Sequence, residues 1–194
     1  IIVNSYEFKK EFKKKLNISS ICIYNPLNKK EIINLSKKKN KNIFFEKSKK
    51  QLNIINIGRM VDQKDQLTLL KALNLIKNKI NFKLLIIGSG KKEDELKRFI
   101  DLNNLNKKIK LLNYMENPYT YLKKSDILVH TSKYEGLPNV LLEALVLKKF
   151  VISSNCPTGP KEILNNGKGG MLFQTGNFKQ LSKMIVFYNS NAKF

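Results

Sequence analysis

Residues 82–90 read FKLLIIGSG, a run of mostly apolar residues that ends in two glycines. No polar residue interrupts it from Leu84 to Ile87, as is typical of a strand covered on both faces. A second apolar run of this kind spans Leu52–Ile57. Between the two, leucine and isoleucine recur every three or four residues over 65–80, the period of a helix with one buried face. The pattern predicts two parallel strands joined by a helix.

The same alternation continues along the rest of the chain. Further strands are expected at 109–112, 127–130, 150–153 and 171–173, and further helices at 93–102, 118–123, 140–147, 160–164 and 178–188. The sequence therefore predicts an α/β protein with a doubly wound, mostly parallel sheet. Ligands of such sheets bind at the carboxyl ends of the strands, so the loops there are expected to surround one site. These loops follow Ile57, Ile87, Leu112, His130 and Ser153.

The first 50 residues are less regular than the remainder. Short strands at 1–4 and 21–24 are expected on either side of a lysine-rich helix at 7–16, and 37–50 is a polar loop or frayed helix. We expect 1–50 to be an inter-domain segment that packs on a domain formed by 51–194. The start does not have the pattern of a signal peptide, and no stretch approaches the roughly 18 apolar residues of a membrane span.

Composition narrows the function classes. The chain has 194 residues, 42% hydrophobic and 27% charged, which excludes fibrous and fully disordered classes. The net charge is +22, but it comes almost entirely from lysine, and residues 1–50 carry +10 of it. A nucleic-acid-binding protein would concentrate arginine on one face, so no specific nucleic acid is expected. Attraction to phosphates or to an anionic membrane surface is expected at this charge.

The two cysteines, Cys22 and Cys156, lie far apart without paired spacing. This favours reduced thiols in a cytoplasmic protein over a disulfide framework or a zinc site.

Two cations follow the strand that ends at Gly58. Arg59 offers a planar fork of donors and Lys64 a mobile point charge, a pair suited to a diphosphate. On spacing alone, a solvated surface pair is an equally good interpretation. Arginine is rare in this chain, which favours a specific use of Arg59. The turn at 88–90 permits close backbone approach but is also an ordinary strand-to-helix turn.

Residues 134–144 read YEGLPNVLLEA and place Glu135 and Glu143 with seven residues between them. Pro138 suits the first turn of a helix, whose free N–H groups then face any anion held nearby. Glu143 is flanked by apolar residues, so it is better explained as an acceptor for ligand hydroxyls than as a surface residue.

Three further features carry weaker signals. The loop at 153–163 is a strand–loop–helix junction rich in turn-forming residues. His130 ends an apolar strand, and a supporting role in the core is favoured over a catalytic base. The lysine-rich run at 9–15 is most simply a solvated helix face, with a membrane surface as the alternative.

Taken in order, these residues resemble the carboxyl-terminal half of a family 4 retaining glycosyltransferase (glycosyl transferases group 1), which has the two-domain GT-B architecture. The resemblance covers almost the whole chain, and its most specific part is the pair of glutamates after Ser125-Asp126-Ile127. The other matching segments are Ile2-Val3-Asn4-Ser5, Ile23-Tyr24-Asn25-Pro26-Leu27 and Gly58-Arg59 with Lys64. Residues 155–162 (NCPTGPKE) are similar to a bacterial subgroup that adds N-acetylgalactosamine or related sugars to glycans, often on lipid carriers.

The resemblance implies a Rossmann-like, nucleotide-sugar-binding domain at 51–194, with the amino-terminal acceptor domain absent. It implies three catalytic residues: Arg59 and Lys64 neutralise the departing diphosphate, and Glu135 contacts the sugar ring. Glu143 would accept hydrogen bonds from the ribose, and the backbone near Met115 would hold the base. The remaining donor-binding positions are Gly58, Gly136, Leu137, Asn139 and Val140.

The implied reaction is transfer of a hexose or N-acetylhexosamine from a UDP-sugar, with retention, to a glycan or polyprenyl-linked acceptor. GDP and ADP remain alternatives to UDP. No metal or other cofactor is expected, and the isolated chain is expected to lack activity. A peripheral position on the inner face of the cell membrane is allowed. The rival hypotheses are a GT-B-like epimerase and a basic nucleotide- or polyanion-binding module without turnover.

Overall fold

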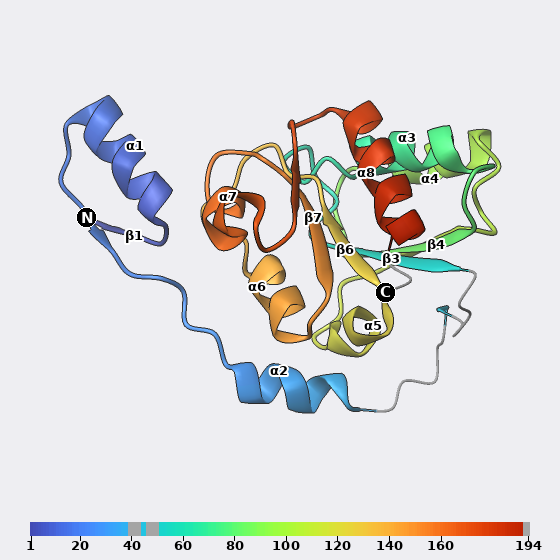
Figure 1. Ribbon diagram of the computed structural model, residues 1–194, viewed down its shortest axis with the longest axis horizontal. Helices are drawn as coiled ribbons and strands as arrows, with labels where there is room; N and C mark the ends of the chain where they lie inside the picture. Colours follow the sequence, from blue (N-terminus) through green and yellow to red (C-terminus); the bar gives the residue numbers. More distant parts are fainter. Residues whose placement is uncertain (39–43, 46–50, 192–194) are drawn as a thin grey trace.

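A six-stranded parallel sheet forms the centre of the molecule in the computed structural model, which describes residues 1–38, 44–45 and 51–191 (Figure 1). The strand order is β5-β4-β3-β6-β7-β8, and every neighbouring pair is parallel. The strands are β3 (Leu52–Ile57), β4 (Phe82–Ile87), β5 (Ile109–Leu112), β6 (Ile127–His130), β7 (Phe150–Ser154) and β8 (Met171–Phe173). The predicted α/β fold with a parallel sheet is confirmed.

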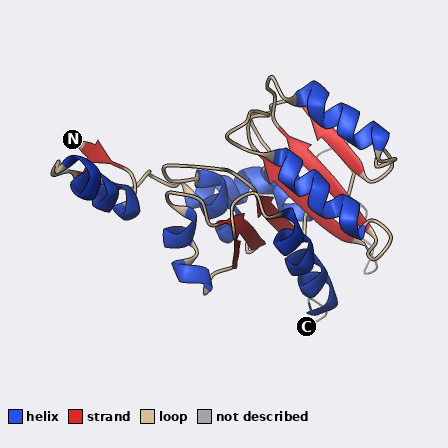
Figure 2. Cartoon of the chain, turned by 90° about the horizontal axis from the view of Figure 1, so that it is seen from above, coloured by secondary structure: helices blue, strands red, loops and turns tan. Residues whose placement is uncertain are grey.

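Helices cover both faces of this sheet (Figure 2). One face packs against α3 (Gln66–Ile76), α4 (Glu93–Leu102) and α8 (Phe178–Asn191). The other packs against α5 (Tyr119–Lys124) and α6 (Asn139–Val146), with α7 (Pro160–Ile163) and the short 3₁₀ helix η1 (Asn165–Gly167) beside them. Successive strand residues point to opposite faces, so Ile54 joins the first apolar layer and Ile55 the second, each with no exposed surface. The uninterrupted apolar strands are the consequence of this double covering.

The sheet reverses its order between β3 and β6. From β3 the chain moves outward to β4 and β5, and then returns to the other side of β3 to form β6. The register joins six residue pairs between β3 and β4 but only two between β3 and β6, at Ile54↔Ile127 and Ile55↔Leu128. Side chains extend this contact: Asn56 Nδ2 donates to the Val129 carbonyl over 2.8 Å. This reversal is where ligands bind in open parallel sheets.

The N-terminal segment forms a small βαβ unit of its own. The strands β1 (Ile2–Val3) and β2 (Ile21–Cys22) pair in parallel on either side of α1 (Tyr6–Leu16). The unit lies at one end of the molecule, beside α7 (Figure 1). Both strands are shorter than predicted, because only two residues of each form ladder pairs.

One helix was not predicted. The helix α2 (Lys29–Ser36) packs against α5 and α6 and buries only Ile32 and Ser36. Two helical turns with a single buried apolar residue leave no periodic pattern to detect. Most of the predicted loop at 37–50 lies outside the described residues. Among the helices that the structure describes, none combines the length and apolar character needed to cross a membrane.

Candidate active site

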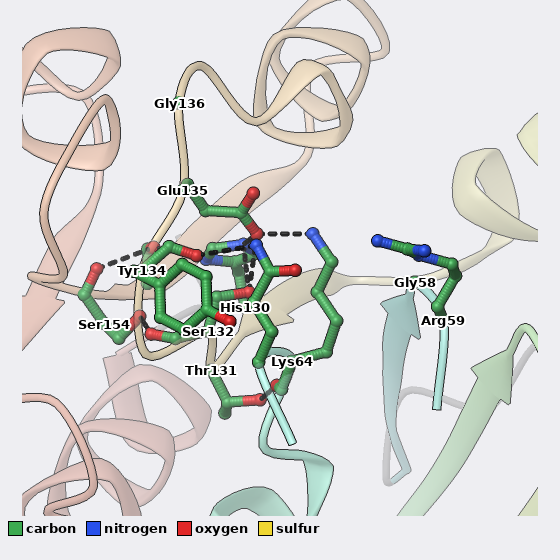
Figure 3. A network of polar contacts seen from close by, with 12 residues as sticks. Gly58, Arg59, Lys64, His130, Thr131, Ser132, Tyr134, Glu135, Gly136 and Ser154 are labelled. Carbon is green, nitrogen blue, oxygen red and sulfur yellow. Dashed lines mark hydrogen bonds and ion pairs between the residues drawn. The ribbon is translucent and has the colours of Figure 1, made fainter. Parts of the chain in front are cut away.

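The candidate site lies where the sheet reverses. The loop after β3 carries Gly58, Arg59 and Lys64, and the loop after β6 carries Glu135 and Gly136; Figure 3 shows the two loops facing each other. The register of β3 against β6 therefore brings together residues that are more than 70 positions apart in the sequence. The predicted convergence of these two loops is observed.

A cluster of hydrogen bonds centres on one oxygen of Glu135. Glu135 Oε1 accepts from Lys64 Nζ, from Ser132 Oγ over 2.6 Å, and from His130 Nε2 over 3.1 Å (Figure 3). Burial alone would raise the pKa of this carboxyl group, but the hydrogen bonds from His130, Lys64 and Ser132 outweigh it and lower the pKa to about 2. Glu135 is therefore an anion at neutral pH, with Oε2 accepting no hydrogen bond from any described residue.

His130 is one of the residues that hydrogen-bond to this carboxylate. Its side chain is almost fully buried, and burial lowers the pKa of the imidazole, which is therefore neutral at physiological pH. Ser153 Oγ lies 3.0 Å from Nδ1. Because Glu135 can only accept, the proton of the neutral ring belongs on Nε2, which leaves Nδ1 as the unprotonated nitrogen beside Ser153. The ring is buried and bonded to Glu135, and this placement fits the supporting role predicted for His130.

Arg59 stands apart from this cluster. Its side chain is exposed, and within residues 1–38, 44–45 and 51–191 it has neither a hydrogen bond nor an ion pair. Figure 3 shows the guanidinium group extending towards Lys64. Two cations on one loop, one of them without an acidic partner among the described residues, are suited to an anion with several negative charges.

At this edge of the sheet, the backbone of the loop after β4 lies very close to the backbone of the loop after β3. A Cβ atom on Gly88 would lie 2.1 Å from the Gly58 carbonyl oxygen, and one on Gly90 would lie 2.4 Å from that of Met60. Both glycines also have positive φ, at +153° and +156°. The glycine turn is thus required by the packing of the loops after β3 and β4.

The start of α6 adds free donors. Pro138 is its N-cap, and the backbone N–H groups of Leu137, Asn139 and Val140 find no acceptor within the described part of the chain. Gly136 precedes them in the same loop. Unpaired N–H groups at a helix start attract an anion, and the helix dipole adds to this attraction.

Glu143 lies one turn further along α6, outside the Glu135 cluster. Tyr119 Oη donates to Glu143 Oε1 over 3.3 Å, and burial raises the pKa of Glu143. Met115 and Tyr119 each pack against the apolar layer on that side of the sheet. The predicted residues thus form two groups: Arg59, Lys64, Glu135 and the α6 start in one, Met115 and Glu143 in the other.

Three residues of these groups were not identified from the sequence: Ser132, Ser153 and Tyr119. Ser132 lies three positions before Glu135, a spacing that could have indicated contact across a tight loop. Ser153 was expected only as the end of a strand at this edge of the sheet, and no local pattern marks its contact with His130 or that of Tyr119 with Glu143. Within the described residues, no three acidic, histidine or cysteine side chains are grouped closely enough to hold a metal ion.

Comparison with known proteins identifies the class to which this fold and site belong. Residues 36–193 match the family model of the glycosyl transferases group 1, and the chain belongs to that family. An uncharacterized glycosyltransferase of Methanocaldococcus jannaschii is 41% identical over 128 residues, which are 66% of this chain and 30% of that protein. The resemblance stated from the sequence is confirmed.

A second relative has an assigned activity. The N-acetylgalactosamine-N,N'-diacetylbacillosaminyl-diphospho-undecaprenol 4-alpha-N-acetylgalactosaminyltransferase of Campylobacter jejuni is 32% identical over 136 residues, covering 68% of this chain and 37% of that enzyme. The chain thus spans about a third of the length of these two relatives.

Solved structures confirm the GT-B type of fold. A glycosyltransferase from Rickettsia africae superposes with a TM-score of 0.84 at 20% identity, over 99% of this chain and 53% of that one. The Anabaena protein HepE, solved with UDP, superposes with a TM-score of 0.81 at 21% identity, over 99% and 54%. This chain corresponds to about half of each.

Proposed function

We propose that this chain is the donor-binding half of a retaining glycosyltransferase that uses a UDP-sugar. The observation that carries the proposal is the convergence of Arg59, Lys64 and the free N–H groups of α6 beside an ionised Glu135. A nucleoside diphosphate is the anion whose size and charge suit two cations and a helix start. Glu143, on the same helix, would then accept hydrogen bonds from the ribose hydroxyls.

The residues then divide the reaction between them. The bond from the anomeric carbon to the diphosphate breaks with its electron pair on the diphosphate, where Arg59 and Lys64 stabilise the new charge. Glu135 Oε2 faces the positive charge that develops on the sugar. With a pKa of about 2, Glu135 cannot supply a proton at neutral pH. The acceptor hydroxyl forms the new bond on the same face, and its proton passes to the departing diphosphate.

The acceptor is proposed by analogy with the second relative, whose name specifies a glycan on diphospho-undecaprenol. We propose a glycan, free or polyprenyl-linked, as acceptor, and a site of action on the cytoplasmic face of the membrane. The charge-stabilising work of a metal ion falls to the two cations in this proposal, so no metal or other cofactor is required.

Thermal unfolding in the presence of UDP, GDP and ADP tests the proposal. UDP at millimolar concentration should raise the melting temperature, because a ligand that binds only the folded state stabilises it by mass action. No shift with any of the three nucleotides would contradict the proposal. A rise in melting temperature that is the same for all three nucleotides and that falls steeply as salt is added would instead indicate a basic polyanion-binding module.

A further inference from the structure

Two carboxylate side chains connect the N-terminal segment to α7. Each segment supplies one carboxylate that accepts hydrogen bonds from backbone N–H groups of the other. Glu162 of α7 accepts from the backbone N–H groups of Tyr6, over 3.0 Å, and Glu7, over 3.1 Å, the first two residues of α1. In return, Glu7 Oε2 accepts over 2.9 Å from the N–H of Gly159, the residue before α7. Each helix start is therefore satisfied by an acidic side chain from the other helix. The hydroxyl of Tyr24, beyond β2, also donates to Glu162.

These contacts are stronger than ordinary surface hydrogen bonds. The N–H groups at a helix start have no partner within the helix, and a carboxylate there also meets the positive end of the helix dipole. Hydrogen bonds to a charged acceptor contribute more than neutral ones. Only 15 residues of this chain are acidic, against 37 basic. Two of those few acids, Glu7 and Glu162, thus join elements 155 positions apart.

The residues that lead into α7 also contact the loop that carries Glu135. Thr158 precedes Gly159, and its N–H donates to the Glu135 carbonyl over 3.1 Å. The N–H of Glu135 donates to the Pro157 carbonyl over 2.7 Å, and Thr158 Oγ1 donates to the carbonyls of Glu135 and Gly136. The backbone of Glu135 is therefore held on both sides by the residues that lead into α7.

The N-terminal segment also touches this loop itself. Asn25 Nδ2 donates to Asn139 Oδ1 over 2.9 Å, and a Cβ atom on Gly136 would lie 3.1 Å from Asn4 Oδ1. Three stretches distant in sequence, at 4–7, 24–25 and 158–162, thus meet around residues 135–139, which we call the Glu135 loop.

We infer that Glu7 and Glu162 are positioning residues, which fasten the N-terminal segment to α7 and thereby hold the Glu135 loop in place for the donor sugar. A movement of residues 1–25 is transmitted to Glu135 through Gly159 and Thr158. The transmission is a property of the contacts alone. Its effect on sugar binding rests on the proposed function.

Hydrogen–deuterium exchange on the 194-residue chain tests the transmission. Glu162→Ala removes all three bonds to the carboxylate and should speed exchange of the hydrogen-bonded amides of Glu135, Thr158 and Gly159 by about ten-fold. Exchange in β3 and β4 should not change. The exchange rates in Glu162→Gln, which keeps one acceptor oxygen, should lie between those of the unaltered chain and those of Glu162→Ala. Glu11→Ala is the control, because Glu11 lies on α1 like Glu7 but, among the described residues, pairs with Lys15 alone.

Two results would overturn the inference. Faster exchange confined to α1, with the amides of Glu135 and Thr158 unchanged, would show that the bonds only cap helices. Faster exchange in every strand would show general destabilisation. Tyr24→Phe, which removes a single hydroxyl, would then be measured: faster exchange in the strands without faster exchange at Glu135 and Thr158 would overturn the inference.

Binding of UDP and of UDP-N-acetylglucosamine gives the second readout. If Glu135 contacts the sugar, Glu162→Ala should lower the affinity for the UDP-sugar about five-fold more than the affinity for UDP, the loss expected for a loosened hydrogen bond. Equal loss for both ligands, or none, would overturn the effect on the sugar. Failure of the unaltered chain to bind either nucleotide would refute the proposed function, while the exchange result would still decide the transmission.

Discussion

Lys64 and Glu135 are bonded to each other through Nζ and Oε1, although the proposed reaction gives them different targets. The side chains of both are largely buried. A diphosphate that draws Lys64 towards itself would leave Glu135 with His130 and Ser132 as its donors. Donor binding and the charge environment of Glu135 are therefore linked.

The first prediction follows from this pair. Arg59→Ala should weaken UDP binding by about 1–3 kcal/mol, the range for a lost charge-assisted hydrogen bond. Lys64→Ala should do the same and should also lower the free energy of unfolding, because it leaves a buried carboxylate short of a donor. Titration calorimetry and thermal unfolding measure the two effects. Lys13→Ala and Lys38→Ala are the controls; equal losses at all four positions would mean that diffuse charge holds the ligand.

The second prediction concerns acid stability. The folded-state pKa of Glu135 is about 2, below its ordinary value of 4.5, so the group stabilises the fold above pH 4.5. This contribution, about 3 kcal/mol at most, should be lost as the pH falls from 4.5 towards 2. The stability difference between the unaltered chain and Glu135→Gln should therefore be constant above pH 5.5 and shrink below it. A stability difference that does not change with pH would contradict the state in which Glu135 is ionised and accepts three hydrogen bonds.

The third prediction separates Tyr119 from Glu143. If Tyr119 holds Glu143 for the ribose, Tyr119→Phe should weaken UDP binding by about 1 kcal/mol, the contribution of one hydrogen bond. The same substitution should have little effect on binding of UDP analogues that lack the ribose hydroxyls. This comparison forms a double-perturbation cycle between the tyrosine and the ligand. Equal losses with UDP and with the deoxy analogues would assign Tyr119 a purely structural role.

The fourth prediction tests the close backbone approach at the site. Gly88→Ala should lower the free energy of unfolding by about 3 kcal/mol or more, because the Cβ atom of the alanine would overlap the Gly58 carbonyl. Gly176→Ala is the matched control: Gly176 also has positive φ, at +77°, but no atom lies within 4 Å of its Cβ position. It should cost only about 1 kcal/mol, the backbone penalty alone. Chemical denaturation of both variants measures the difference, and similar losses would contradict the steric argument.

The fifth prediction is negative. Sugar transfer needs donor and acceptor oriented in a cleft that excludes water, and this chain spans only part of its relatives. We expect the 194-residue chain to bind UDP-sugar without measurable transfer to a lipid-linked acceptor. Joined to the rest of a related enzyme, it should transfer sugar, and Glu135→Gln should then reduce turnover more than donor affinity. Robust product from the chain alone would contradict the prediction.

Sequence reasoning predicted the elements of the sheet because each strand is an apolar run and each long helix has a clear period. It also identified Arg59, Lys64 and Glu135, since each follows a strand that ends at the same edge of the sheet. It did not identify Tyr119 or Ser153, whose partners lie 24 and 23 positions away and are set by packing between elements. The helix α2 escaped because it buries too little apolar surface to leave a pattern.

The narrow junction between β3 and β6 has a mechanical consequence. The loop with Arg59 belongs to the half of the sheet that contains β3, β4 and β5, and Glu135 belongs to the half with β6, β7 and β8. The ladder at this boundary has two residue pairs, fewer than any other ladder of the sheet, so a force that separates the halves should open the sheet there first. A nucleotide held by both loops would cross-link the halves at this boundary. The force needed to pull the protein apart should then rise with nucleotide concentration, which would make its resistance to stretching a direct measure of ligand occupancy.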